Sequence, residues 1–172
     1  MPFNLKLTPS LAVACRSWCG DLTLVTASGG AITSYELDSF ASDGVIPDDW
    51  KKDQSTLLGI TIGQGITSIG DNAFDGCSGL LGNLVIPASV TEIGFGAFFE
   101  CSGFIGTLTL NEGLLKIQHC AFEKCEGFTG NLVIPDSVTL IEEEAFRDFG
   151  TGAGTLTLGS GITKLKDKSF KC

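Results

Sequence analysis

The fold is decided by the stretch Leu132-Val133-Ile134-Pro135-Asp136-Ser137-Val138-Thr139-Leu140-Ile141-Glu142-Glu143-Glu144-Ala145-Phe146. Its pattern of apolar residues recurs every 24 residues over the last two thirds of the chain. Aligned on this spacing, the sequence contains four complete units and one partial unit, at 60–83, 84–107, 108–131, 132–155 and 156–172. Such a regular recurrence is the signature of a repeat architecture.

Each unit is expected to begin with a short β-strand. Its first and third positions are apolar in all five units, and a Thr or Val stands between them, which is the alternation of a half-buried strand. Gly, Pro or Asn at position four and Gly or Ser at position six then end the strand. The Val-Thr-x-Ile segment that follows is expected to return on the other side, so that one repeat makes one coil.

Two further features are expected to close the coil. The Ala-Phe pair at positions fourteen and fifteen suits a single helical turn that directs the Phe inward, and glycines at positions twenty and twenty-three suit corners. Stacked coils place equivalent strands about 4.8 Å apart in a parallel sheet. Because one unit cannot bury its own apolar residues, at least about three must stack.

The motif resembles the BspA-type leucine-rich repeat. The resemblance rests on the quoted stretch 132–146 and on Ala-Phe-x-x-Cys at 73–77, 97–101 and 121–125, and it covers residues 60–172. It implies a leucine-rich-repeat solenoid of about five 24-residue repeats with short parallel strands. It also implies a place at a cell surface or outside the cell, a role in adhesion and protein recognition, and no catalysis. No contact residue is implied, because this family has no universal ligand site.

The segment before the array is interpreted as an irregular N-terminal cap, residues 1–59, that contains a degenerate repeat. Leu22-Thr23-Leu24 resembles the first strand of a unit, and Ile32-Thr33-Ser34-Tyr35 and Ser39-Phe40 resemble its later parts. An insertion at roughly 41–59 is expected to separate this unit from the array. A short helix from Ser10 to Trp18 would bring Cys15 and Cys19 onto one face.

The C-terminal units carry two local departures from the pattern. Unit four has Phe149 where other units have Cys, and Gly150-Thr151-Gly152-Ala153 replaces an apolar corner, so that corner is expected to be looser. The partial unit is rich in Lys between 164 and 171, which suits a polar cap on the stack. The alternative is that the array continues on a partner chain or in a further segment. Alternate units also open alike, which favours a longer period of 48 residues.

Composition excludes some classes of function. The 172 residues include 20 Asp+Glu against 11 Lys+Arg, for a formal charge of -9, which argues against a nucleic-acid partner. No apolar run approaches the ~18 residues of a membrane span. The first residues are too short and too interrupted for a signal peptide, although cleavage before Cys15 is an alternative.

The cysteines and the single histidine are the candidates for chemistry. Cys77, Cys101 and Cys125 form a column at the repeat spacing, and burial as small apolar residues explains them better than a disulfide or metal ladder. His119-Cys120 with Glu123 and Cys125 matches no usual zinc spacing. We therefore predict no metal and no cofactor. An enzyme would need a site around His119, and this stays the alternative from another class.

The predicted binding surface is the outward side of the short strands, which is uncharged and made of small polar and apolar groups. A protein partner of unknown identity is expected to bind there, either in surface adhesion or with this chain as an accessory subunit of a larger assembly. Ice or ordered-water binding through the Thr-x-Thr strands is a further alternative. The predicted residues are Thr61, Asn83, Val85, Thr107, Thr109, Asn131, Val133, Thr155 and Thr157.

Overall fold

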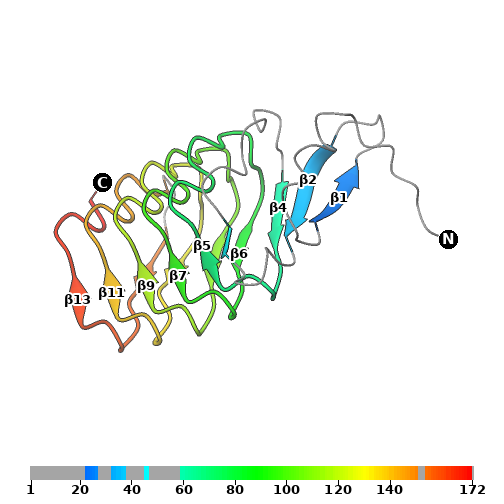
Figure 1. Ribbon diagram of the computed structural model, residues 1–172. Coiled ribbons are helices and arrows are strands. Elements are labelled where there is room, and N and C mark those ends of the chain that lie inside the picture. Colours follow the sequence, from blue (N-terminus) through cyan, green and yellow to red (C-terminus); the bar gives the residue numbers. More distant parts are fainter. Residues whose placement is uncertain (1–21, 27–31, 38–44, 47–58, 151–153, 172) are drawn as a thin grey trace.

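The computed structural model describes residues 22–26, 32–37, 45–46, 59–150 and 154–171. From residue 59 onward the chain is a parallel β-solenoid whose coils stack side by side, with the C-terminal coil at one end (Figure 1). The predicted solenoid of 24-residue units is therefore confirmed. The expected helix at 10–18 and most of the expected insertion at 41–59 lie outside the described residues.

Each coil contributes two short strands. The first strands of the five units are β4 (Gly59–Ile62), β6 (Leu84–Ile86), β8 (Leu108–Leu110), β10 (Leu132–Val133) and β12 (Leu156–Thr157). The second strands lie in the Val-Thr-x-Ile segments and are β5 (Ser68–Ile69), β7 (Glu92–Ile93), β9 (Lys116–Ile117), β11 (Leu140–Ile141) and β13 (Lys164–Leu165).

The more continuous sheet is the one that the sequence did not predict. The second strands, together with β3 (Val45–Ile46), form a six-stranded parallel sheet in the order β13-β11-β9-β7-β5-β3. Among the first strands, β6 pairs with β8 and β10 pairs with β12, whereas β4 pairs with β2. The prediction that the first strands form one continuous sheet is therefore wrong. This pairwise arrangement agrees with the predicted 48-residue period.

The N-terminal strands correct the alignment of the degenerate unit. β1 (Leu22–Thr26) is antiparallel to β2 (Ile32–Leu37), and β2 is parallel to β4 with Tyr35 opposite Ile60. β3 pairs with β5. Thus β2 and β3 stand where the two strands of a unit belong, whereas Leu22-Thr23-Leu24 lies in a hairpin partner outside the parallel register.

The core is built from columns of identical or similar side chains. One column stacks five Phe rings, with centroids 4.8 to 5.2 Å apart and planes within 10° of parallel. Phe149 leaves the cysteine column and joins a second stack, 5.1 Å from Phe128 and edge-on to the first. The first column consists of Phe74, Phe98, Phe122, Phe146 and Phe170.

The corner around the Ala-Phe pair is a series of turns, and the single helical turn expected there is not confirmed. In the first unit, Ala73, Asp75 and Cys77 donate their N–H groups to carbonyls three residues earlier. The N–H groups of the alternating residues, such as Phe74, instead donate to the next coil, at 2.7 Å to the carbonyl of Ala97. Because every second N–H points along the stack, the corner continues the ladder between coils.

The glycines of the array serve close approach as well as turning. At position twenty, a Cβ on Gly103 would lie 2.1 Å from the carbonyl oxygen of Ser78, and one on Gly127 would lie 2.4 Å from that of Ser102. Neither distance is sterically allowed, so backbones of adjacent coils meet there because side chains are missing. Gly82 and Gly130, at position twenty-three, have φ of 84°.

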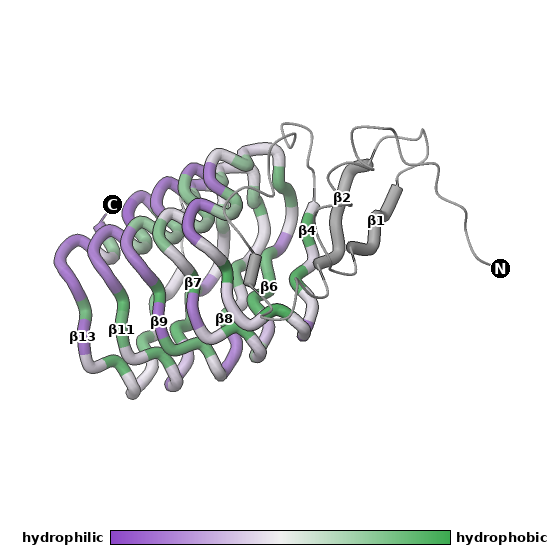
Figure 2. Tube along the Cα trace, in the orientation of Figure 1, coloured by the Kyte–Doolittle hydropathy of each residue, from purple (hydrophilic) through white to green (hydrophobic). Residues whose placement is uncertain are grey.

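The last described coil is more exposed than the others. Leu156, Leu158 and Leu165 are 45 to 48% exposed, whereas the matching residues of the preceding unit are buried. The tube around β13 is mostly hydrophilic (Figure 2), and its lysines are exposed. The lysine-rich cap expected here therefore leaves these leucines uncovered. Residues 151–153 of the corner expected to be looser lie outside the described residues.

Replacing a ring inside the first Phe column is expected to destabilise the whole stack. Phe122→Ala removes a buried ring that contacts Phe98 and Phe146, and we expect a loss of about 3–5 kcal/mol in the free energy of unfolding. The matched control is Phe95→Ala, which removes a ring that is 43% exposed. Urea unfolding followed by circular dichroism measures both. An equal loss in the two variants would contradict a core role for the column.

Candidate functional site

All nine predicted binding residues are exposed on the outward side of the first strands. In units two to four they alternate with buried residues, as in β6, where Leu84 and Ile86 are buried and Val85 is 49% exposed. The Leu and Ile side chains enter the core because the strand places successive side chains on opposite faces. The structure thus brings the predicted residues together as columns that run along the solenoid.

Two apolar residues extend this surface, and the sequence reasoning missed them. Leu81 is 50% exposed and Ile105 is 65% exposed, each two residues before a predicted Asn or Thr. Extending the period-2 alternation backwards from each strand would have found them. We use the name first-strand face for the nine predicted residues together with Leu81, Ile105 and Thr129.

The Asn residues of the first-strand face are also structural. Oδ1 of Asn83 accepts hydrogen bonds from the backbone N–H and the hydroxyl of Thr107, at 2.8 and 3.2 Å. Oδ1 of Asn131 accepts one from the N–H of Thr155, at 3.0 Å. Each Asn therefore ties its unit to the next, and its amide NH₂ group can donate to a partner.

These bonds explain why the first strands pair two by two. Asn stands before β6 and β10, where its carbonyl reaches the N–H of the following coil. Thr107 stands before β8 and has no side-chain carbonyl to offer to the next coil. The 48-residue period therefore reflects one position, just before each first strand, where an Asn that accepts a hydrogen bond alternates with a Thr that donates one.

The same alternation weakens the ice-binding alternative. In each Thr-x-Thr pair one Thr precedes and one lies in β8 or β12, and the unit between them instead has Asn131 before β10 and Val133 within it. Hydroxyl groups therefore do not recur on adjacent strands of this face. Ordering a lattice of water molecules would need Thr hydroxyls on every unit, at the 24-residue period.

The opposite surface, formed by the outward side of the second strands, is more charged. Glu92 and Lys116 are opposite each other in β7 and β9, and Gln118 donates to Glu92 at 2.6 Å. The ring of His119 stacks on Phe95, with centroids 5.5 Å apart and planes 2° from parallel. We call this surface the second-strand face.

The structure divides the four residues weighed as a zinc set. Cys125 is fully buried and its thiol donates to the carbonyl of Phe98 at 2.9 Å. The buried Glu123 forms an ion pair with Arg147. His119 and Cys120 instead come together with Glu144 of the next coil, with one ligand atom from each residue lying within 4.8 Å of the others.

Cys120 does not have the features of an activated nucleophile. It is 7% exposed, and burial, with the hydrogen bond to and charge of Glu123, raises the pKa of its thiol to about 12. Catalytic cysteines need the thiolate near neutral pH. Although Nδ1 of His119 lies 3.0 Å from Sγ of Cys120, the pair therefore supports the enzyme alternative poorly.

The cysteine column packs and donates, as predicted for a structural role. Cys77, Cys101 and Cys125 are buried in the core. The Sγ of Cys101 donates to the carbonyl of Phe74 at 3.0 Å. Burial, followed by the charges of its cysteine neighbours, raises the pKa of Cys101 well above its usual value, and burial also raises that of Cys125.

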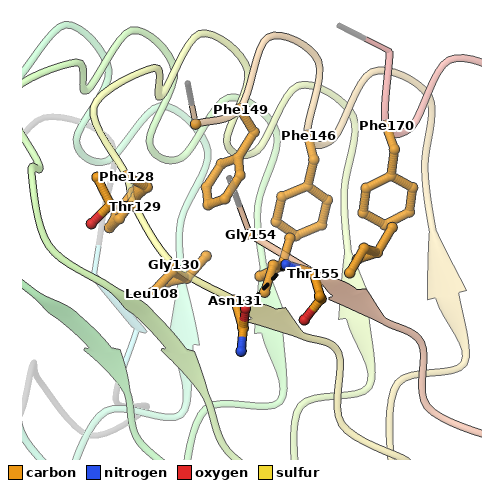
Figure 3. Close-up of a pocket in the computed structure, with 13 residues that line it drawn as sticks. Leu108, Phe128, Thr129, Gly130, Asn131, Phe146, Phe149, Gly154, Thr155 and Phe170 are labelled. Carbon is orange, nitrogen blue, oxygen red and sulfur yellow. Dashed lines mark hydrogen bonds between the residues drawn. The ribbon is translucent and has the colours of Figure 1, made fainter. Parts of the chain in front are cut away.

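A hollow of about 240 Å³ lies near the C-terminal end of the stack (Figure 3). Phe128, Phe146, Phe149 and Phe170 point toward it. Gly150 and Gly154 also line it, and residues 151–153 between them are outside the described chain. The hollow is therefore assigned no ligand.

No helix within the described ranges is long and apolar enough to cross a membrane. A family model described as the BspA-type leucine-rich-repeat region matches residues 48–172 in six copies. No curated protein matches the chain.

Two solved structures are similar. A T. pallidum leucine-rich-repeat protein, TpLRR, is 21% identical with a TM-score of 0.56, over 88% of this chain and 64% of that one. The pneumococcal vaccine antigen PcpA is 17% identical with a TM-score of 0.43, over 81% of this chain and 48% of that one. This chain thus spans less than two thirds of either protein, and the first likeness supports the leucine-rich-repeat fold.

The thiols of the cysteine column are expected to resist alkylation in the folded protein. With pKa values raised by burial, Cys101 and Cys125 have almost no thiolate at pH 8. Iodoacetamide labelling followed by peptide mass spectrometry should leave both unmodified until urea unfolds the chain. Labelling of these residues in the native protein, at the rate seen in urea, would show that the column is accessible.

The Asn83 bond can be tested with two substitutions. Asn83→Ala removes the acceptor for Thr107 and should cost about 1 kcal/mol of stability. Asn83→Asp keeps an oxygen in the same place and should retain more of the stability than Asn83→Ala. The midpoint of urea unfolding measures both variants, and an Asn83→Ala variant as stable as the unmodified protein would rule out this structural role.

Proposed function

Because the chain belongs to the BspA-type leucine-rich-repeat family, we propose that it is a non-enzymatic recognition module that binds a protein through its first-strand face. It would act in surface adhesion or as an accessory subunit of a larger assembly. The observation that carries this proposal is the row of exposed apolar side chains set among Asn and Thr on that face.

The chemistry of the face supports a protein partner. Leu81, Val85, Ile105 and Val133 are 49 to 65% exposed, and burying them against a partner would gain about 25 cal/mol for each Å² of apolar surface. Thr and Asn between them offer hydroxyl and amide groups for hydrogen bonds. Interfaces commonly combine an apolar centre with polar groups in this way.

The absence of charge on this face also favours binding. The protein has a formal charge of -9, yet no residue of the first-strand face is charged. Burying an unpaired charge costs far more than burying a hydroxyl or amide that finds a hydrogen bond. A partner can therefore cover this face at little cost in desolvation, and the carboxylates elsewhere keep the free protein soluble.

Charge placed on the first-strand face should weaken binding. Thr109→Glu and Val133→Glu each insert a carboxylate into the proposed interface, and we expect affinity to fall by at least about tenfold. The matched control is Leu115→Glu, which replaces a residue that is 45% exposed outside this face. Partners identified by crosslinking to the unmodified protein are measured by surface plasmon resonance. Unchanged binding by both face variants, or an equal loss in the control, would reject the placement.

A further inference from the structure

We propose that His119, Cys120 and Glu144 form a zinc site on the edge of the second-strand face. Nδ1 or Nε2 of the imidazole, Sγ of the thiol and one carboxylate oxygen lie within 4.8 Å of one another. Imidazole, thiolate and carboxylate are the three ligand types that Zn²⁺ takes from proteins. The site is separate from the first-strand face and does not depend on the function proposed for that face.

The repeat geometry assembles the three donors from two coils. Cys120 and Glu144 occupy the same position in adjacent units, with φ of 56° and 57°. The backbone N–H of Cys120 donates to the carbonyl of Glu143 at 3.2 Å, which fixes the two coils at this point. Stacking therefore places a thiol and a carboxylate one above the other, and the adjacent His119 completes the group.

The side chains around the donors hold them in place. The ring of His119 is stacked on Phe95, and its Nδ1 lies 3.0 Å from Sγ of Cys120. Arg147 and Lys168 both contact Oε1 of Glu144, at 2.9 and 3.6 Å. Outer partners of this kind orient ligands at metal sites.

Binding of the metal at this site would release a proton from the thiol. Zn²⁺ would bind as the Cys120 S–H bond breaks, with the thiolate coordinating the metal and the proton passing to the buffer.

Three protein ligands leave one position of a tetrahedral zinc ion for water. Cys120 is 7% exposed and the side chain of Glu144 is 15% exposed, so the metal would be shielded on the side of the coils. His119 is half-buried, which leaves an approach from solvent. The site would thus carry an exchangeable ligand.

The repeat itself supplies substitutions that preserve the fold. Cys120→Asn installs the residue found at the same position in the first unit, where Asn72 has φ of 52°. His119→Phe installs the residue found one unit earlier, Phe95, and keeps an aromatic ring for stacking. Glu144→Gln removes the carboxylate alone, and Glu143→Gln is the matched control beside it.

The test is titration of the full chain with Co²⁺ and then with Zn²⁺, after reduction and metal removal. We expect one Co²⁺ per chain, with a thiolate-to-cobalt charge-transfer band that Zn²⁺ displaces, and proton release in calorimetry that depends on the buffer. Loss of an outer partner typically costs about 10–100-fold in metal affinity, and each of the three ligand variants should weaken Zn²⁺ binding by at least that much. Glu143→Gln should bind as the unmodified protein does.

Thermal unfolding without metal checks that each variant is folded, and the rise in Tm with Zn²⁺ should be lost only in the ligand variants. The absence of a charge-transfer band in the unmodified protein would overturn the proposal. So would a band that persists in His119→Phe and Glu144→Gln, since this would place the metal on other thiols.

Discussion

The fixed register between adjacent coils is the constraint on which the rest of the structure depends. Phe rings of the first column stack 4.8 to 5.2 Å apart, which is close to the strand spacing of about 4.8 Å. The ring stack and the backbone ladder therefore agree, and each coil repeats the one before it. A coil with a different length would break both at once, because every corner N–H that points along the stack has one partner in the next coil.

This register turns each position of the repeat into a column and so divides the protein into two surfaces of different chemistry. Position two is outward and uncharged in all five units, from Thr61 to Thr157. Position thirteen lies in the corner that precedes the Phe column, and in three successive coils it holds Cys120, Glu144 and Lys168. Charges one coil apart lie close enough to pair, as Lys168 and Glu144 do, while the uncharged face remains available for contact with a partner.

The 24-residue period was enough to predict the solenoid, the inward residues and the exposure of the nine residues proposed for binding. The sequence did not predict the second sheet. Its strands, such as Ser68-Ile69, are only two residues long, which is too short for an alternation of apolar and polar residues to be recognised. Leu81 and Ile105 were missed because the alternation of outward and inward residues was not extended backwards past the glycine that follows each of them. The meeting of Cys120 with Glu144 depends on stacking, as does the use of Asn83 as a tie between units.

The differences between units therefore carry more information about function than their similarities do. Inward columns vary little because the stack permits little, and when Phe149 replaces a cysteine it moves into the neighbouring ring stack. At position thirteen the backbone keeps a positive φ of 52° to 57°, although the residue changes from Asn72 and Gly96 to Cys120, Glu144 and Lys168. The left-handed conformation is therefore set by the stack, whereas the chemical group that each unit offers at this corner differs. The ion pair of Lys168 with Glu144 and the approach of Cys120 to Glu144 both arise from these differences.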